Sequence, residues 1–238
     1  MEIEISDDMT DDNKICFITC VNNETIYAKC LDFLNRLIVP PNVAVEYKAV
    51  REASSMCEGY NKAMAESDAR YKVYLHQDAY ITYPYFIHRL RNIFEERAIG
   101  MVGMIGAQTL PESCVWWESK DKCGWVTDTS PGFPIEQKYL KRAKNKYEEV
   151  AAIDGLLMAT QYDITWRADL FDGWHFYDVA QCFEFRRVGY KVVTPVLPCS
   201  QVMHDCGIVD HTGYLKYRDI LKAEYGAEIL KIQVRESL

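Results

Sequence analysis

The sequence has no block of five or six lysine and arginine residues that could follow a nucleic-acid backbone. Its 238 residues include 27 basic and 35 acidic side chains, which give a formal net charge of −8. Binding along a phosphate backbone requires a basic stripe that displaces counterions. We therefore expect no nucleic-acid partner.

Paired cysteine motifs and long apolar runs are also missing. The nine cysteines are odd in number and form no C-x-x-C motif, which favours reduced thiols over a disulfide framework. No apolar stretch approaches the roughly 18 residues of a membrane span. The first fourteen residues hold six acids and one lysine, unlike a secretory signal. These features predict a soluble, cytoplasmic protein.

Glycine is missing where a phosphate-binding loop would need it. The segment TCVNNETIY, which follows the first apolar run, contains none, so the triphosphate loop of sugar nucleotidyltransferases is absent. Gly100, Gly103 and Gly106 do not form a G-x-G-x-x-G fingerprint, because they fall inside an apolar run and not between a strand and a helix. The sequence thus disfavours nucleotidyl transfer and dinucleotide binding.

What is present is an alternation of strand and helix patterns. Apolar runs predict strands at 15–21, 43–50, 71–75, 100–107, 153–160, 191–196 and 201–204. Three- and four-residue apolar spacing predicts helices at 24–37, 56–65, 84–98, 179–188 and 213–234. Residues 108–135 show neither pattern and are expected to be irregular. The alternation of strands and helices along the sequence favours an α/β fold with a mostly parallel central sheet flanked by helices.

The same pattern predicts the domain organisation. An acidic leader at 1–13 precedes a single domain at 14–212, in which 14–107 would handle a nucleotide and 108–212 an acceptor. Residues 213–238 form a tail whose amphipathic helix would dock on the body or on another subunit, so a homo-oligomer is one prediction.

Polar residues directly after strands carry the functional signal, because ligands of open α/β sheets lie beyond the carboxyl ends of the strands. Such residues are Asn22 and Glu24 after the first strand, His76-Gln77-Asp78 after the third, and His204 after the last. A further polar cluster, WHFYD, ends at Asp178.

Three segments resemble family 2-like glycosyltransferases of GT-A fold, in particular the branch related to a streptomycin-biosynthesis protein. They are ITCVNNETIYAKCLDFL, EGYNKAMAESDARYKVYLHQDAYI and FDGWHFYDVAQCFEFRRVGYKV, the last read together with VMHDCG. The resemblance spans roughly residues 14–207. It implies a GT-A-like, Rossmann-like fold and inverting transfer of a sugar from a UDP-, GDP- or dTDP-linked donor. The acceptor would be a saccharide, a lipid-linked or a small molecule, in polysaccharide, glycolipid or natural-product glycosylation.

A metal site at Asp78 and His204 follows from the same reasoning. The diphosphate that leaves a sugar nucleotide needs a cation, and an acidic protein without a basic cluster does better with a bound divalent metal. Carboxylate and phosphate oxygens suit Mg²⁺ or Mn²⁺, and an imidazole tilts the choice toward Mn²⁺. The family's usual motif is D-x-D, whereas this chain has His76 at the first position. The alternative is that Asp78 begins a turn and His204 is a hydrogen-bonded histidine.

Asp178 is the predicted catalytic base, because an acceptor hydroxyl needs a group that removes its proton as the new bond forms. The resemblance places the family's catalytic acidic residue at this position, where this chain reads Tyr177-Asp178. His175 is the alternative base. Asp178 as a helix N-cap remains the competing structural interpretation.

The remaining candidates lie around the donor and the acceptor. The resemblance implies donor contacts from Thr19, Asn22, Glu24, Asn61, Gln77 and Asp78. Asp154, Gly155 and Trp174 are predicted to frame the acceptor, since indole faces stack on sugar rings. The alternative function is a nucleotide- or sugar-binding module of the same fold that does not catalyse transfer.

Overall fold

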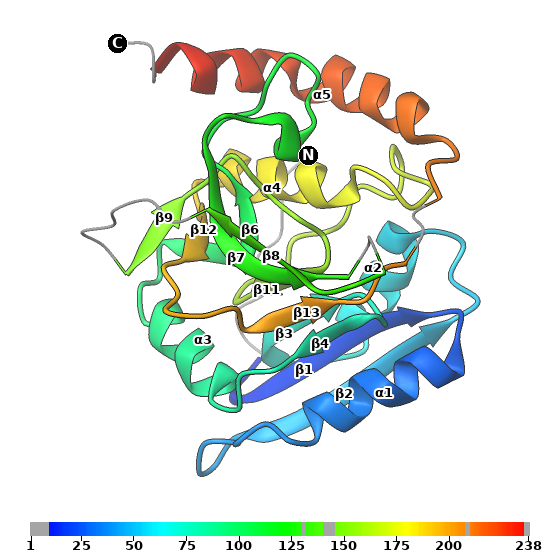
Figure 1. Cartoon of the computed structure of the whole chain (residues 1–238), viewed down its shortest axis with the longest axis vertical. Helices are drawn as coiled ribbons and strands as arrows, with labels where there is room; N and C mark the ends of the chain where they lie inside the picture. Colours follow the sequence, from blue (N-terminus) through cyan, green and yellow to red (C-terminus); the bar gives the residue numbers. More distant parts are fainter. Residues whose placement is uncertain (1–9, 130–131, 140–145, 208–209, 236–238) are drawn as a thin grey trace.

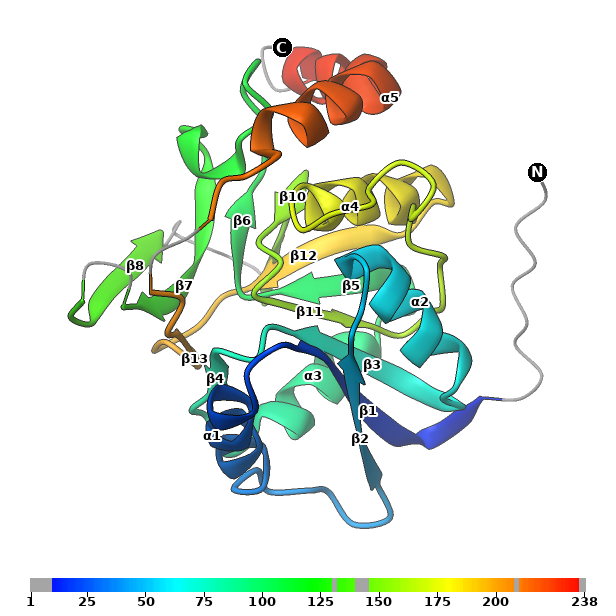
Figure 2. The ribbon, with the colours of Figure 1, turned by 90° about the vertical axis from the view of Figure 1, so that its right-hand side faces the viewer.

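Two sheets form the centre of the molecule in a computed structural model, which describes residues 10–129, 132–139, 146–207 and 210–235 (Figure 1). Within these residues the larger sheet has the strand order β2-β1-β3-β11-β5-β12-β9, and the smaller follows β10-β6-β7-β13-β4 with β8 paired to β7. Helices cover both faces of the larger sheet: α1 and α3 lie on one side, α2 and α4 on the other (Figures 1 and 2). The predicted α/β class is confirmed.

The first half forms as the apolar pattern predicts. β1 (Asp11–Val21) pairs in parallel with β2 (Ala44–Arg51) and β3 (Ala69–Leu75). Between them lie α1 (Glu24–Leu34) and α2 (Met56–Ala65). The side chain of Asn23 caps α1 and that of Ser55 caps α2, each accepting from backbone N–H groups of the first turn. β1 begins inside the predicted leader, whose residues 1–9 lie outside the described residues.

The sheet is mixed because β11 (Leu157–Thr160) runs antiparallel between β3 and β5 (Ile99–Gly103). β12 (Lys191–Pro195) is parallel to β5, and β9 (Tyr147–Glu149) closes the edge antiparallel to β12. The single strands predicted at 100–107 and 153–160 are each divided in two. β6 (Ile105–Ala107) and β10 (Ala152–Ile153) leave the larger sheet and pair with each other in the smaller one.

Glycine permits this division. A side chain at Gly106 would collide with the backbone carbonyl oxygen of Ala152 on β10. A side chain at Gly103 would overlap Ile153. The close approach of these two segments of the chain therefore depends on the absence of a Cβ atom at Gly103 and Gly106.

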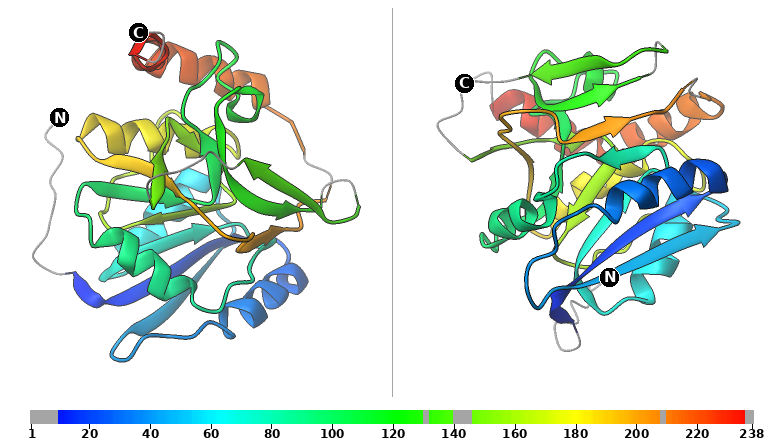
Figure 3. Two further views of the ribbon diagram at one scale, coloured as in Figure 1. Left: turned by 60° about the vertical axis from the view of Figure 1, so that its left-hand side comes forward. Right: turned by 60° about the horizontal axis from the view of Figure 1, so that its bottom comes forward.

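The smaller sheet corrects the expectation that residues 108–135 are irregular. The segment holds a short 3₁₀ helix, η1 (Trp116–Glu118), and β7 (Lys122–Asp128), and it ends at the start of β8 (Ile135–Tyr139). β13 (Val202–His204) lies between β7 and β4 (Ala79–Ile81), parallel to the first and antiparallel to the second. Figure 3 shows this sheet beside the larger one. It brings the end of β13 next to the end of β3.

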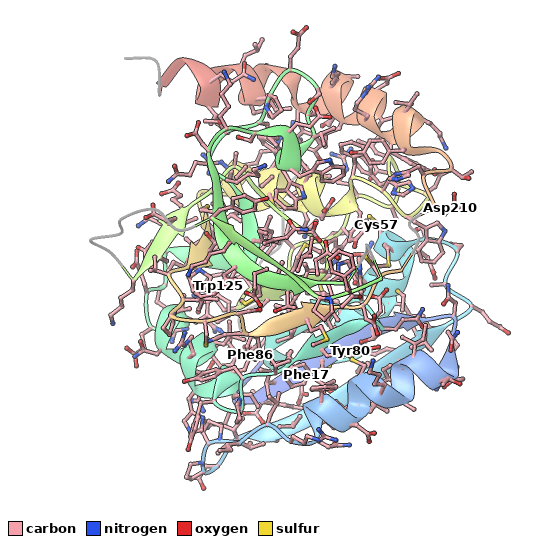
Figure 4. The ribbon with its side chains drawn as sticks, in the orientation of Figure 1. Phe17, Cys57, Tyr80, Phe86, Trp125 and Asp210 are labelled. Carbon is pink, nitrogen blue, oxygen red and sulfur yellow. The ribbon has the colours of Figure 1, made fainter. Side chains whose placement is uncertain are left out.

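Aromatic side chains fill the core between the sheets and the helices. Phe17 on β1, Tyr80 on β4 and Phe86 at the start of α3 (Phe86–Phe94) are at most 2% exposed (Figure 4). Behind them, the ring of Trp166 lies 4.9 Å from the rings of both Tyr60 and Tyr74. α4 (Tyr177–Arg187) packs on this aromatic group through its first turn.

The C-terminal helix α5 (Tyr214–Arg235) lies on α4 (Figure 2). Its apolar stripe is buried against the body: Leu221 and Tyr225 are 0% exposed. Arg187 of α4 bonds Glu224 at 2.8 Å and Glu228 at 2.7 Å. The predicted tail helix is therefore present and docked within the chain. No helix among the described residues is both long and apolar enough to cross a membrane.

Candidate active site

Two cavities meet at the carboxyl ends of β3 and β13. One, of about 360 Å³, is lined by residues that include Asn22, Gln77 and Asp78. The other, of about 380 Å³, includes Asp154 and Asp178. Both are also lined by His76, Trp174, His175, His204 and Cys206. Three of the six predicted donor residues and all three predicted acceptor residues thus line two adjoining cavities, which share part of their lining.

His204 and Asp78 come together because the register of β13 on β4 pairs His204 with Ala79. The backbone N–H of Asp205 also donates to the carbonyl of Asp78 at 2.8 Å. Nε2 of His204 lies 3.6 Å from Oδ1 of Asp78, within ion-pair range but too long for a hydrogen bond. Burial disfavours the charged form of each side chain. The attraction between the Asp78 carboxylate and the His204 imidazolium nevertheless raises the pKa of His204 to about 10 and lowers the pKa of Asp78.

The chemistry of this cluster fits a divalent metal. Apart from their 3.6 Å contact with each other, Oδ1 of Asp78 and Nε2 of His204 are buried and have no hydrogen-bond partner among the described residues. Buried polar atoms are nearly always paired, so this arrangement requires an explanation. One ligand atom each from His76, Asp78 and His204 can be chosen so that all three lie within 4.8 Å of one another. Imidazole and carboxylate donors of this kind bind first-row divalent ions.

Asp178 lies in the first turn of α4 and is not its N-cap, which is Phe176. Its Oδ2 accepts from the backbone N–H of Gly155 at 3.0 Å, and its Oδ1 accepts from that of Val179 at 2.8 Å. Burial, together with the neighbouring Asp154 carboxylate, raises the pKa of Asp178 to about 7. A carboxylate with this pKa is suited to accept a proton near neutral pH.

The turn before α4 aims Tyr177 and Asp178 into the site. Phe176 has φ of 60°, a left-handed conformation that is rare for a bulky residue. The Tyr177 hydroxyl lies 2.5 Å from Nε2 of His76 and 3.5 Å from the carbonyl of Gly155. A side chain at position 155 would collide with that hydroxyl. A strained backbone conformation of this kind persists only where neighbouring contacts, such as those of the Tyr177 hydroxyl, hold it in place.

The donor-side loop is held by Gln77. Its Oε1 accepts from the backbone N–H groups of Asn22 at 3.1 Å and Asn23 at 3.0 Å, and its amide donates to Asn22 Oδ1. Glu24 is engaged by Arg51 through bonds of 2.6 and 3.0 Å. The first βα loop is therefore tied to the strand end that carries Asp78.

Three predicted donor residues, Thr19, Glu24 and Asn61, line neither cavity. Thr19 is 1% exposed on β1. Both ends of the Asn61 amide bond the backbone of Trp166 at 2.8 Å. The contacts of Asn61 give it a supporting role, and donor binding by all three residues stays a prediction.

The acceptor-side cavity has an aromatic wall. Trp174 is 50% exposed and lines both cavities, as does His175. The ring of His175 lies 5.3 Å from that of Tyr214 at the start of α5, and burial lowers the pKa of His175. Asp210, labelled in Figure 4, lines the donor side from the segment that leads into α5.

Sequence reasoning did not assign roles to several residues of this site. Tyr177, Tyr214, Cys206 and Asp128 line the acceptor-side cavity. The Sγ of Cys206 lies 3.8 Å from Oδ1 of Asp128. A signal existed for Tyr177 and Cys206, since each lies within two positions of a predicted site residue.

Solved structures share this architecture. The 1–349 fragment of S. aureus TarS, solved with UDP, matches with a TM-score of 0.55 and 9% identity over 89% of this chain and 65% of that chain. For the longer S. aureus TarS structure the TM-score is 0.56 at 9% identity, over 89% of this chain and 39% of that chain. GalNAc-T7, solved with UDP, GalNAc and Mn²⁺, matches with a TM-score of 0.52 and 12% identity over 94% and 50%.

These matches define the fold as that of GT-A glycosyltransferases, and this chain spans less than two thirds of each matched chain. No curated protein is similar to it in a sequence comparison. Residues 16–225 match the sequence profile of the Glycosyltransferase like family, and the chain belongs to that family. The resemblance to glycosyltransferases is thereby confirmed. The narrower likeness to the streptomycin branch stays a prediction.

Proposed function

We propose that this chain is an inverting glycosyltransferase that moves a sugar from a nucleotide-diphosphate sugar to an acceptor hydroxyl. The observation that carries the proposal is the presence of His204 and Asp178 in the walls of one cavity. One residue belongs to a cluster that fits a metal, and the other is a carboxylate with a pKa near the operating range of a base. A reaction that joins two substrates needs these groups on opposite sides of the transferred sugar.

Asp178 takes the acceptor proton in this proposal. Its pKa of about 7 suits it to act as the base near neutral pH, and a single displacement by the activated hydroxyl inverts the anomeric centre. The N–H groups of Gly155 and Val179 hold both carboxylate oxygens and so fix the direction of the base. His175 lines the same cavity and is the alternative base.

Asp78 and His204 would hold the divalent cation, Mn²⁺ or Mg²⁺, on the donor side. A cation there supplies neutralisation of the charge that develops on the leaving diphosphate. Gln77 keeps the first βα loop beside the cluster, which suits Asn22 and Glu24 to contact a UDP-, GDP- or dTDP-linked donor. The TarS fragment and GalNAc-T7 were solved with UDP, which supports this donor class.

Asp154, Gly155 and Trp174 would frame the acceptor, a saccharide, lipid-linked or small molecule. The half-exposed indole of Trp174 offers a face on which a sugar ring can stack. We further propose a cytoplasmic location, supported by the nine cysteines, none of which forms a disulfide.

Thermal unfolding with UDP, GDP, dTDP and CMP, each with and without Mn²⁺, tests the proposal. Selective binding to the folded state at a hundredfold excess over the dissociation constant adds about 2.7 kcal/mol of stability. We expect one diphosphate to raise the midpoint strongly only when metal is present. Stabilisation without transfer or donor hydrolysis would favour the binding module, and no stabilisation by any nucleotide would contradict the donor class.

A further inference from the structure

His76 is the least expected member of the cluster at the end of β3. We propose that His76 is a third protein ligand of the metal, that Tyr177 fixes its ring, and that the resulting two-imidazole, one-carboxylate set selects transition ions over Mg²⁺. The inference rests on the proposed function, since it concerns the same site. It goes beyond that function by naming the ligand set and the class of ion.

The positions of the ligand atoms support His76 as a ligand. Nδ1 of His76 lies 3.9 Å from Oδ1 of Asp78, and Nε2 of His204 lies 3.6 Å from the same oxygen. Two ligand atoms, each about 2.1 Å from a common ion, lie about 3.0 Å apart at a right angle and about 3.4 Å apart at the tetrahedral angle. The two distances to Asp78 would need to shorten by only a few tenths of an ångström, and one ligand atom from each of the three residues lies within 4.8 Å of the others.

Tyr177 determines which nitrogen of His76 faces the ion. Its hydroxyl has one proton and lies 3.5 Å from the Gly155 carbonyl, which can only accept, and 2.5 Å from Nε2 of His76. When the hydroxyl donates to Gly155, it accepts from Nε2–H of His76. In this tautomer the lone pair is on Nδ1, the nitrogen nearer to Asp78.

Tyr177 is itself held rigidly, so it acts as a positioning residue. It is 3% exposed, and its ring lies 6.0 Å from Tyr60 and 6.2 Å from Trp166. Partners that bind the second nitrogen of a ligating histidine orient the ring, and their loss typically lowers metal affinity by about 10- to 100-fold.

The ligand chemistry sets the ion preference. Mg²⁺ is usually bound through carboxylates, phosphates and retained water. Imidazole suits later first-row ions, whose affinities rise from Mn²⁺ toward Co²⁺ and beyond. Two imidazoles and one carboxylate therefore favour these ions, and the remaining coordination positions stay open to diphosphate oxygens.

Titration of the untagged, chelator-treated full chain with Co²⁺ tests the inference without any donor or activity. Visible d–d absorption reports inner-sphere ligands, and competition with Mg²⁺ reports selectivity. We expect Co²⁺ binding that a hundredfold excess of Mg²⁺ does not displace. His76→Ala and Tyr177→Phe should each weaken Co²⁺ binding by about 10-fold or more. His88→Ala, which changes an exposed histidine on α3, is the matched control and should bind as wild type.

A fourth variant keeps the test decisive if Tyr177→Phe fails to fold. His76→Asp exchanges an imidazole for a carboxylate and should narrow the preference for Co²⁺ over Mg²⁺ by at least about 10-fold. Unchanged Co²⁺ affinity and spectrum in His76→Ala, or displacement of Co²⁺ by an equal concentration of Mg²⁺, would overturn the inference. Failure of the proposed function gives a different result, namely normal Co²⁺ binding without stabilisation by any nucleotide.

Discussion

The backbone N–H of Gly155 donates to Oδ2 of Asp178 at 3.0 Å, across 23 residues of sequence. The bond joins the turn between β10 and β11 to the first turn of α4. Asp178 is the only carboxylate among the described residues whose pKa is raised to about 7. The position and the proton affinity of this group therefore come from two separate segments of the fold.

Asp178→Asn should lower transfer by about 10² to 10⁴-fold, because the amide cannot take the acceptor proton. In the wild type, the rate should rise with pH through a limb near pH 7, since burial and Asp154 raise the pKa of Asp178 to about 7 and only the carboxylate acts as base. Asp154→Asn removes one raising charge and should shift the limb to lower pH. Activity of Asp178→Asn equal to wild type would remove the assignment.

Gly155→Ala should lower both stability and activity, because the added methyl collides with the Tyr177 hydroxyl and approaches Cβ of Asp178 to 3.2 Å. Overpacking of this kind costs about 1 to 3 kcal/mol. Gly226→Ala is the control: a Cβ at this position in α5 meets nothing within 4 Å, and the change should stabilise by about 0.5 to 1 kcal/mol. Denaturant unfolding compares the two, and equal stability of both variants would contradict the crowding argument.

Leu221→Ala should destabilise by about 2 to 5 kcal/mol, because this side chain of α5 is 0% exposed. Leu230→Ala, on the same helix but 61% exposed, should change stability by less than about 0.5 kcal/mol.

Deletion of 213–238 followed by a molar-mass measurement tests the predicted oligomer. Unchanged mass with intact folding would eliminate the tail as the assembly element.

Asn61→Ala and Gln77→Ala separate support of the fold from donor binding. Asn61 bonds the backbone of Trp166 at both ends of its amide, so its loss should cost about 1 to 3 kcal/mol. Unchanged nucleotide affinity in this variant would limit Asn61 to support of the fold. Gln77→Ala frees the loop at Asn22 and Asn23 and should weaken nucleotide binding at nearly unchanged stability. Calorimetric titration with UDP checks both, and weaker UDP binding by a stable Asn61→Ala variant would instead make Asn61 a donor contact.

Local patterns predicted most of the elements. The helix expected at 56–65 is present with those bounds, because Ser55 caps it and its apolar spacing is regular. The division of 100–107 into β5 and β6 could not be predicted, since every residue of both strands is buried and the apolar run is continuous. β7 was missed because its sequence KCGWVTD has a weak strand signal, and its pairing with β6 and β13 makes it a strand.

The site, like the fold, has features that local sequence could predict and features that it could not. Asp78, Asp178 and His204 could be selected because they are acidic or imidazole residues next to strand or helix ends. The contact between His76 and Tyr177 joins residues 101 positions apart, and no local pattern encodes it. The pKa of Asp178 also depends on Asp154 and on burial, which exist only in the folded chain.

The docking of α5 on α4 has a consequence for biosynthesis. α5 is the last of the described elements to be synthesised, yet Leu221 and Tyr225 complete the packing around α4, whose first turn carries Asp178. A nascent chain that has already made both sheets still exposes this apolar surface until α5 is translated. Ribosome-bound intermediates that lack α5 should therefore recruit chaperones, and catalytic competence should arise only after α5 has been synthesised.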